Sequence, residues 1–358
     1  MKSDIDARVE YDDNIFLTTE PHNGVSSIKL TPTLSGIVRE LNWDTEFEIK
    51  LRGNKYSDSN LNSNDQYFNL TGRYLLERNI FSLNVNHNFD SNLNVDSTDF
   101  GISGFRVNRK MQSISPQYTR LLSERANMIF TYTYRDVDYL EADSTAYRPY
   151  ISESGSASLT YGLTERDKLN FSLSVVDYTS KDELVTYQMF VSNIGIEHEV
   201  SETLSSDFMV GISRQNVTNL TTYTFDFFGK AVTHEQEIDT TNRNLVLNAG
   251  ITQLLEYGSI VGRVNRSNFT DSFGGINQVD RFTLGYEQRL SSLWRYTLNG
   301  RYEDITAIGL TSSSTDRDVF MFEAISYYSF SRNWSLNASY RYLIRKFKSV
   351  TSGDRAAQ

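Results

Sequence analysis

The chain of 358 residues has no cysteine and only four prolines. Without thiols it can form no disulfide, no thiolate metal site and no cysteine nucleophile. Few prolines favour long strands, because proline cannot donate to a sheet ladder. The formal net charge is −10, and lysine and arginine form no cluster, so we expect no nucleic-acid partner.

Long apolar runs are also missing, the longest being short stretches such as VFMF at residues 319–322. A membrane helix needs about 20 consecutive apolar residues, so the sequence predicts no spanning helix. The other structure that lipid admits is a closed β-barrel, whose polar lumen lowers its hydropathy. A mean hydropathy of −0.46 is therefore compatible with a membrane protein.

Apolar and polar residues alternate in many segments, as in WSLNASYRYLIRKF at residues 334–347 and DTEFEIKLR at residues 44–52. Alternation of this kind is typical of strands with one apolar and one polar face. Aromatic residues, at 13% of the chain, also favour strands. Ionised pairs such as Glu46 and Glu48 cannot face hydrocarbon without a large cost. We therefore expect lipid on one face and an aqueous lumen on the other.

Short polar turns recur every 35 to 55 residues, by an approximate count, and looser polar stretches lie between them. The short turns are expected at residues 39–42, 77–79, 123–125, 164–167, 201–203, 256–258, 291–292 and 331–333. Bacterial outer-membrane barrels show this asymmetry, with tight periplasmic turns and longer outer loops. No Pro- or Gly-rich linker divides residues 1–358, which predicts a single domain.

Counting strands between these turns gives about 17, the first at residues 4–16 and the last at 334–348. Because such barrels usually have an even number, we predict an all-β, transmembrane, antiparallel up-and-down β-barrel of 18 strands. Residues 349–358 are interpreted as an outer loop, so the last strand is expected to be missing from this chain. The alternative is a 16-stranded barrel. Pro32 and Pro116 fall inside proposed strands, which predicts bulges or wrongly placed strands there.

The tryptophans Trp43, Trp294 and Trp334 each follow a short turn and begin a strand on its apolar face. This placement predicts an aromatic girdle at the periplasmic boundary of the membrane. The alternative, that they cap the core of a soluble β-sandwich or propeller, fits less well, because repeated strands of about 15 residues are unusual in soluble sheets.

The stretch YDDNIF, residues 11–16, resembles the first-strand signature of the type-two beta-barrel porin family. On that resemblance Tyr11, Asp12, Asp13, Asn14, Ile15 and Phe16 are the signature residues. Over the rest of the chain only the regular succession of hairpins supports the resemblance. The expected absence of a closing strand departs from the family pattern. Members are associated with exopolysaccharide production, so the resemblance implies a conduit for polymer secretion across the outer membrane.

The alternation assigns a set of charged residues to the lumen. The candidates are Glu46, Glu48, Arg73, Arg135, Arg263, Arg281, Glu287, Arg295, Arg301, Glu303, Glu323, Arg341 and Arg345. Arginine predominates late in the chain, which predicts a cationic wall that attracts an acidic polymer. The alternative is that the charges pair across strands and only solvate the lumen.

No catalytic or cofactor site is expected. The four histidines, His22, His87, His198 and His234, lack both a serine two residues later and a second histidine at metal-ligand spacing. Asp12, Asp13 and Asn14 offer hard oxygen ligands for calcium, but their spacing matches no known loop, and a polar strand end is the simpler interpretation. We predict a non-enzyme with no cofactor and no metal.

The start of the chain has no apolar signal segment, which indicates a mature form. No globular segment precedes the first strand, so a plugged, energy-coupled transporter is not expected. Residues 219–240 are read as an inward constriction carrying aromatic rings or, preferably, as two strands that extend above the membrane as a hairpin.

Three functions remain open for a barrel located in the bacterial outer membrane. The first is an exopolysaccharide secretion conduit in contact with outer-membrane lipid, fed by a periplasmic or inner-membrane export component, with a wide lumen and no inward plug. The second is a general or selective diffusion porin for small solutes, with a constriction. The third is a structural or adhesive barrel whose lumen is blocked by side chains.

Overall fold

The computed structural model describes residues 1–17, 23–91, 106–140, 147–227, 230–270, 276–308, 316–348 and 355–357. For residues 221–227, 230–235, 270 and 355–357 it describes the backbone alone. Within these ranges no helix is long and apolar enough to cross a membrane. The helical element described is a 3₁₀ turn, Ser59–Leu61.

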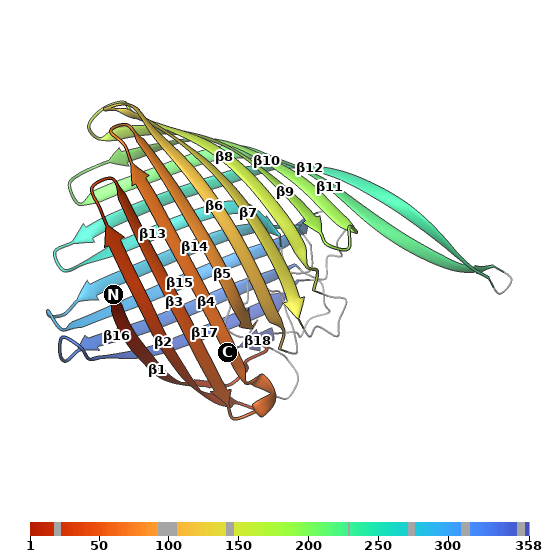
Figure 1. The fold of residues 1–358 in the computed structure, drawn as a ribbon, viewed down its shortest axis with the longest axis horizontal. Helices are drawn as coiled ribbons and strands as arrows, with labels where there is room; N and C mark the ends of the chain where they lie inside the picture. Colours follow the sequence, from red (N-terminus) through yellow and green to blue (C-terminus); the bar gives the residue numbers. More distant parts are fainter. Residues whose placement is uncertain are drawn as a thin grey trace.

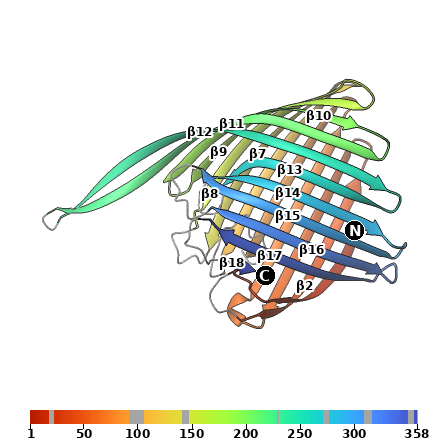
Figure 2. The same ribbon diagram turned by 180° about the vertical axis from the view of Figure 1, so that it is seen from behind.

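The chain forms antiparallel strands that wrap around a common axis (Figures 1 and 2). Each strand pairs with its neighbours in sequence, so the fold is an up-and-down β-barrel. The strands are β1 Lys2–Asp12, β2 Val25–Arg39, β3 Trp43–Tyr56, β4 Ser63–Leu75, β5 Asn79–Ser91, β6 Asn108–Ser123, β7 Ala126–Leu140, β8 Tyr150–Gly162, β9 Asp167–Ser180, β10 Val185–Glu199, β11 Leu204–Phe227, β12 Lys230–Leu255, β13 Gly258–Thr270, β14 Ile276–Arg289, β15 Trp294–Ile308, β16 Arg317–Ser329, β17 Ser335–Phe347 and β18 Arg355–Ala357.

The predicted fold class is confirmed, with two corrections at the end of the chain. Residues 355–357, expected in an outer loop, instead form a short β18 that pairs with β17 through Ile344↔Ala357 to Lys346↔Arg355. The described sheet therefore contains part of an eighteenth strand, and the 16-stranded alternative is wrong.

All eight predicted short turns lie where expected and gather at one end of the barrel, called here the short-turn end (Figure 1). The chain closes them with local hydrogen bonds. Trp294 N–H, for example, donates to Ser291 Oγ at 3.1 Å, and Trp334 N–H donates to Ser331 Oγ at 3.1 Å. Serine hydroxyls thus replace the missing ladder partners at the turn. The longer connections lie at the opposite, long-loop end.

Pro32 and Pro116 interrupt the pairing between neighbouring strands without shifting the strand register. Pro32 pairs with Ile5 of β1, but the ladder between β2 and β3 skips from Leu30↔Gly53 to Thr33↔Lys50. The ladder between β6 and β7 is likewise interrupted around Pro116. The expected bulges are absent there, because losing one N–H donor breaks a single rung and leaves the alternation of faces intact.

β11 and β12 are the longest strands, of 24 and 26 residues. Their register runs without a break from Leu204↔Gln253 to Phe227↔Lys230, whereas β10 accompanies β11 only as far as Asn219. The hairpin therefore projects well beyond the other strands (Figures 1 and 2). This confirms the preferred interpretation of residues 219–240, and the inward constriction is wrong.

The backbones of β10 and β11 lie unusually close to one another at Gly195. A side chain at Gly195 would place its Cβ 2.8 Å from the carbonyl oxygen of Phe208 on the next strand. Only glycine fits there, because a backbone oxygen cannot move aside as a flexible side chain can.

Candidate functional site: the barrel lumen

The register divides every strand into an inward and an outward face. On β3 the outward face carries Trp43, Phe47, Ile49 and Leu51, and the inward face carries acidic and basic residues that pair with polar residues of β4. Following direct partners from strand to strand places all thirteen lumen candidates on the inward face. Their role in passage stays a prediction.

Most of the inward arginines are paired with carboxylates. The pairs include Arg73 with Asp44 at 2.9 Å, Arg341 with Glu323 at 2.8 Å, Arg263 with Asp207 at 3.7 Å and Arg295 with Glu287 at 3.9 Å. The expected cationic wall late in the chain is therefore largely neutralised, as the alternative interpretation required.

Glu303 is the centre of a buried ionic cluster on this wall. It is fully buried and contacts Arg281 of β14 and, at 3.6 Å, Arg301 of its own strand. A buried carboxylate needs charge partners of this kind to stay ionised. Two further carboxylates of the candidate set, Glu46 and Glu48, lie on β3, where Glu48 pairs with Lys50 at 3.3 Å.

Arg135 and Arg345 differ from the other inward arginines. Arg135 is exposed on β7 and has no carboxylate partner among the described residues. Arg345 is buried on β17 and donates hydrogen bonds to the carbonyl oxygens of Phe16 at 3.4 Å and Leu17 at 3.1 Å. Among the thirteen candidates, the exposed arginine without a carboxylate partner thus lies on β7, in the first half of the chain, and not on the late strands where cationic charge was expected.

Residues 13–17, called here the inward segment, fold into the barrel at the long-loop end. Leu17 is buried against the inward side chains Val279, Ile305, Val319 and Leu343, which come from four consecutive strands, β14 to β17. A hydrogen bond from Leu17 N–H to the Asn14 carbonyl, 2.9 Å, tightens the turn. The segment therefore links the beginning of the chain to its last strands.

This segment contains part of the signature at residues 11–16, whose predicted single strand is corrected. β1 ends at Asp12, whose carboxylate accepts a hydrogen bond from Asn14 N–H at 2.9 Å. The bond is the mark of an Asx turn. The described residues contain no group of three or more His, Cys, Asp or Glu side chains that could hold a metal ion. The hydrogen bond between Asp12 and Asn14 turns the chain at this point.

The apolar patch beneath Leu17 explains the run at residues 319–322. Phe320 and Phe322 face outward, while Val319 and Met321 face inward, where Val319 is buried in the cluster and Met321 packs against it. In the sequence, apolar residues at the inward positions 319 and 321 break the alternation, which indicates that another segment covers this part of the inward face. The pattern did not reveal which segment it was.

A row of inward tyrosines lines the opposite side. Tyr150, Tyr178 and Tyr187 lie on adjacent strands, with ring centroids 4.9 Å apart for each neighbouring pair. Ile276, at the start of β14, belongs to the same buried cluster. Packing thus narrows the lumen at the long-loop end, whereas polar side chains line it towards the short turns.

The outward face is apolar over the middle of each strand and charged towards the long-loop end. The first charged residues towards the long-loop end form what is called here the outer charged belt, which includes Asp136, Glu153, Asp177, Arg214, Arg243, Arg266, Asp280, Asp304, Asp318 and Lys346. Such a boundary matches the change from hydrocarbon to headgroups and water.

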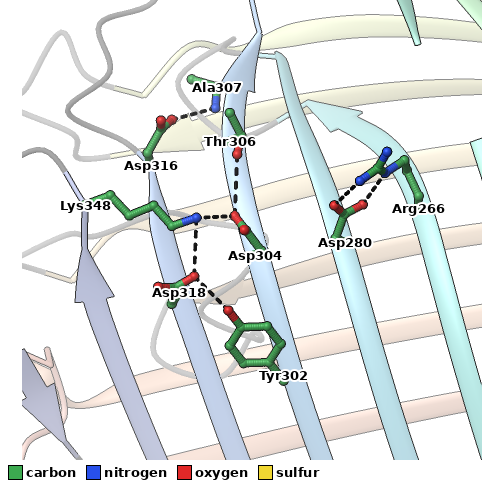
Figure 3. Close-up of polar contacts among 9 residues, drawn as sticks. All are labelled: Arg266, Asp280, Tyr302, Asp304, Thr306, Ala307, Asp316, Asp318 and Lys348. Carbon is green, nitrogen blue, oxygen red and sulfur yellow. Dashed lines mark hydrogen bonds and ion pairs between the residues drawn. The ribbon is translucent and has the colours of Figure 1, made fainter. Parts of the chain in front are cut away.

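Figure 3 shows one part of this belt. Asp304 directly faces Asp280 and Asp318 on the neighbouring strands, an arrangement of like charges that is unfavourable by itself. Lys348 bridges Asp304 at 2.5 Å and Asp318 at 3.4 Å, and Arg266 pairs with Asp280 (Figure 3). Each carboxylate in this part of the belt therefore has a cation.

At the short-turn end the three tryptophans lie on the outward face. Trp43 and Trp294 have tyrosines as direct partners, Tyr74 and Tyr328, and all three tryptophans are exposed. Trp294 Nε1 donates to Ser326 Oγ at 2.9 Å. The placement is that of rings at a membrane interface, and the girdle itself stays a prediction.

No family model and no curated protein matches the chain. Among solved structures, the ferric yersiniabactin uptake receptor FyuA from Yersinia pestis is similar with a TM-score of 0.55 and 10% identity, over 92% of this chain and 61% of that one. The copper transporter OprC matches with a TM-score of 0.53 and 11% identity, over 97% and 63%. The ferric-catecholate import receptor Fiu from E. coli K12 matches with a TM-score of 0.51 and 7% identity, over 99% and 69%.

The chain spans less than two thirds of the length of FyuA and OprC. At such identities the likeness concerns the fold alone. Together with the apolar outward band and the charged belt above it, this fold places the protein in the bacterial outer membrane, in contact with its lipid.

Proposed function

We propose that the barrel is a conduit through which a hydrophilic substrate crosses the outer membrane, and that this substrate is an exopolysaccharide leaving the cell. The observation that carries the proposal is the polar inward face towards the short-turn end, where polar side chains follow one another from strand to strand. A barrel of about 16 to 18 strands is wide enough to enclose an aqueous channel.

The chemistry of the wall supports a sugar polymer more than an ion. Its arginines are mostly compensated by carboxylates, and amide side chains such as Asn84 and Asn86 on β5 lie between the charged clusters. Hydroxyl-rich substrates exchange hydrogen bonds with such groups without demanding one sign of charge. The choice of exopolysaccharide within that class rests on the resemblance of residues 11–16, and the polymer enters from an export component at the short-turn end.

The direct test is the amount of secreted and surface polysaccharide in a strain lacking the gene, complemented with the full chain. We expect polymer to disappear and the full chain to restore it. A second complementing variant, Arg135→Gln, removes the exposed inward charge, and Lys110→Gln, an outward residue of β6, is its matched control. Unchanged polymer in the deletion strain would refute secretion.

The second candidate, a diffusion porin for small solutes, is favoured by the inward segment at the long-loop end, since a constriction sorts solutes by size. Purified full chain in liposomes separates the two. A porin gives rapid swelling in small sugars and a growth defect of the deletion strain on a limiting solute, with secreted polymer unaffected.

A further inference from the structure

One pair of like charges in the outer charged belt has no countercharge. Arg214 of β11 is the direct cross-strand partner of Arg243 of β12. Both side chains are exposed, and neither has an ion pair among the described residues. Like charges directly opposite one another destabilise a sheet. The other like-charged row of the belt, Asp280, Asp304 and Asp318, is neutralised by Arg266 and Lys348.

The pair lies at the upper edge of the apolar outward surface. Ile212 and Leu245, partners of one another, are the next outward residues towards the short-turn end and are 64% and 51% exposed. Phe190 of β10 faces Arg214 from the side and is 45% exposed. Residues this apolar belong in hydrocarbon, so the two guanidinium groups lie at the depth of the lipid headgroups.

Among the described residues, the neighbours on the other side form no ion pair with the two arginines. Thr241 donates its hydroxyl to Asn216 at 3.1 Å, and the next outward carboxylate along these strands, Asp239, accepts a hydrogen bond from Thr218 at 2.6 Å. On β9, Asp177 accepts from Gln188 of β10 at 2.7 Å. Asp239 lies four residues along β12 from Arg243, and Asp177 lies on a strand that does not pair with β11, so neither carboxylate directly faces an arginine of the pair.

From this geometry we infer that Arg214 and Arg243 bind the phosphate group of an anionic lipid in the outer leaflet. Guanidinium groups bind phosphate through paired hydrogen bonds. Two of them side by side match the charge of one phosphate monoester, while the apolar residues below match the acyl chains. Binding removes the repulsion between the arginines, so lipid and barrel stabilise one another at this position.

The test uses the full chain, purified in neutral detergent and reconstituted in phosphatidylcholine vesicles with or without bisphosphorylated lipid A. The wild type should unfold at a higher temperature with the phosphorylated lipid. Arg214→Gln with Arg243→Gln should lose roughly thirtyfold in lipid affinity, because each basic residue near an anionic surface contributes about fivefold. In phosphatidylcholine alone the double variant should unfold at a higher temperature than the wild type, since the repulsion is gone.

Lys346→Gln is the matched control, because Lys346 is in the same belt but faces the carboxylate-bearing residue Asp318, and its lipid affinity should stay within about twofold of the wild type. Arg214→Lys with Arg243→Lys, which keeps both charges, should retain part of the binding. Equal lipid affinity of wild type and double glutamine variant would overturn the inference. An equal stabilisation by dephosphorylated lipid A, or by free inorganic phosphate without lipid, would overturn it as well.

Discussion

The guanidinium of Arg345 donates a hydrogen bond of 3.1 Å to the carbonyl oxygen of Leu17, a residue 328 positions earlier in the chain. Leu17 is at the same time buried in the apolar cluster on β14 to β17. One end of the inward segment is thus held to the last strands of the barrel by a charged hydrogen bond and by apolar contact.

This attachment can be measured by thiol labelling, because the chain has no cysteine of its own. Leu17→Cys should react slowly with a polar maleimide, and adding Arg345→Gln should accelerate the reaction roughly tenfold to a hundredfold, the range expected for a hydrogen bond from a charged group. Leu41→Cys, in an exposed turn, should react fast with either residue at position 345. Equal rates at position 17 would show that Arg345 does not hold the segment.

The buried cluster around Glu303 should dominate the stability of the late strands. Glu303→Gln leaves Arg281 and Arg301 without their carboxylate and should lower the free energy of unfolding by about 3–5 kcal/mol. Urea unfolding of the two proteins in vesicles measures this change in the free energy of unfolding. Glu46→Gln, at an exposed inward position of β3, should change this free energy by less than about 0.5 kcal/mol. A small effect at position 303 would mean that water replaces the carboxylate there.

The assignment of faces can be tested at adjacent residues of β9. Leu173 is outward and 62% exposed, and Ser174 is inward. Leu173→Arg should lower the free energy of unfolding in vesicles by about 2–4 kcal/mol, the cost of a cation in the hydrocarbon region. Ser174→Arg should be tolerated, because its guanidinium reaches the lumen. The opposite order would reverse the two faces of the barrel.

The connection between β9 and β10 should loosen in acid. Partial burial raises the pKa of Asp182, but hydrogen bonds from Ser180 and the Leu184 N–H and the charge of Arg148 outweigh it, so this pKa lies below its usual value. Because the folded pKa is depressed, the stabilisation is present above the ordinary aspartate pKa and is lost as the pH falls through the lower, folded value. Cleavage of the loop by an acid protease should therefore become faster as the pH falls through this range. Asp182→Asn should remove the dependence of the cleavage rate on this carboxylate.

Arg135 should set ion preference if the lumen conducts, because it is an exposed inward charge without a carboxylate partner among the described residues. Arg135→Glu should shift the reversal potential across a salt gradient towards cation preference, and Lys110→Glu on the outward face should not. The shift should shrink in about 1 M salt, where the screening length is about 3 Å. An unchanged potential would place the narrowest part of the lumen away from β7.

Local patterns were sufficient for the turns, the faces and the order of strands. Alternation in β3 and β9 separates lipid from lumen because neighbouring side chains point to opposite sides. Turns that contain serine or charged residues mark where the chain reverses direction within each hairpin. Such features depend on residues close in sequence, so the residues themselves carry the information.

The inward segment could not be predicted because it depends on residues more than 260 positions apart. Inward Val279, Ile305 and Val319 show that part of the lumen wall is apolar, but nothing nearby in sequence says that Leu17 covers it. The choice between a cationic wall and charges paired across strands could not be made from the sequence for a related reason. Composition counts charges, whereas compensation depends on cross-strand register, which places Arg341 opposite Glu323.

Pairing of every strand with its neighbours in sequence makes the hairpin the modular unit of this architecture. A hairpin can be duplicated or deleted by a single event without rethreading the remaining chain, and the circumference then changes by two strands. Lumen width can in this way evolve in discrete steps, independently of the loops that select what enters.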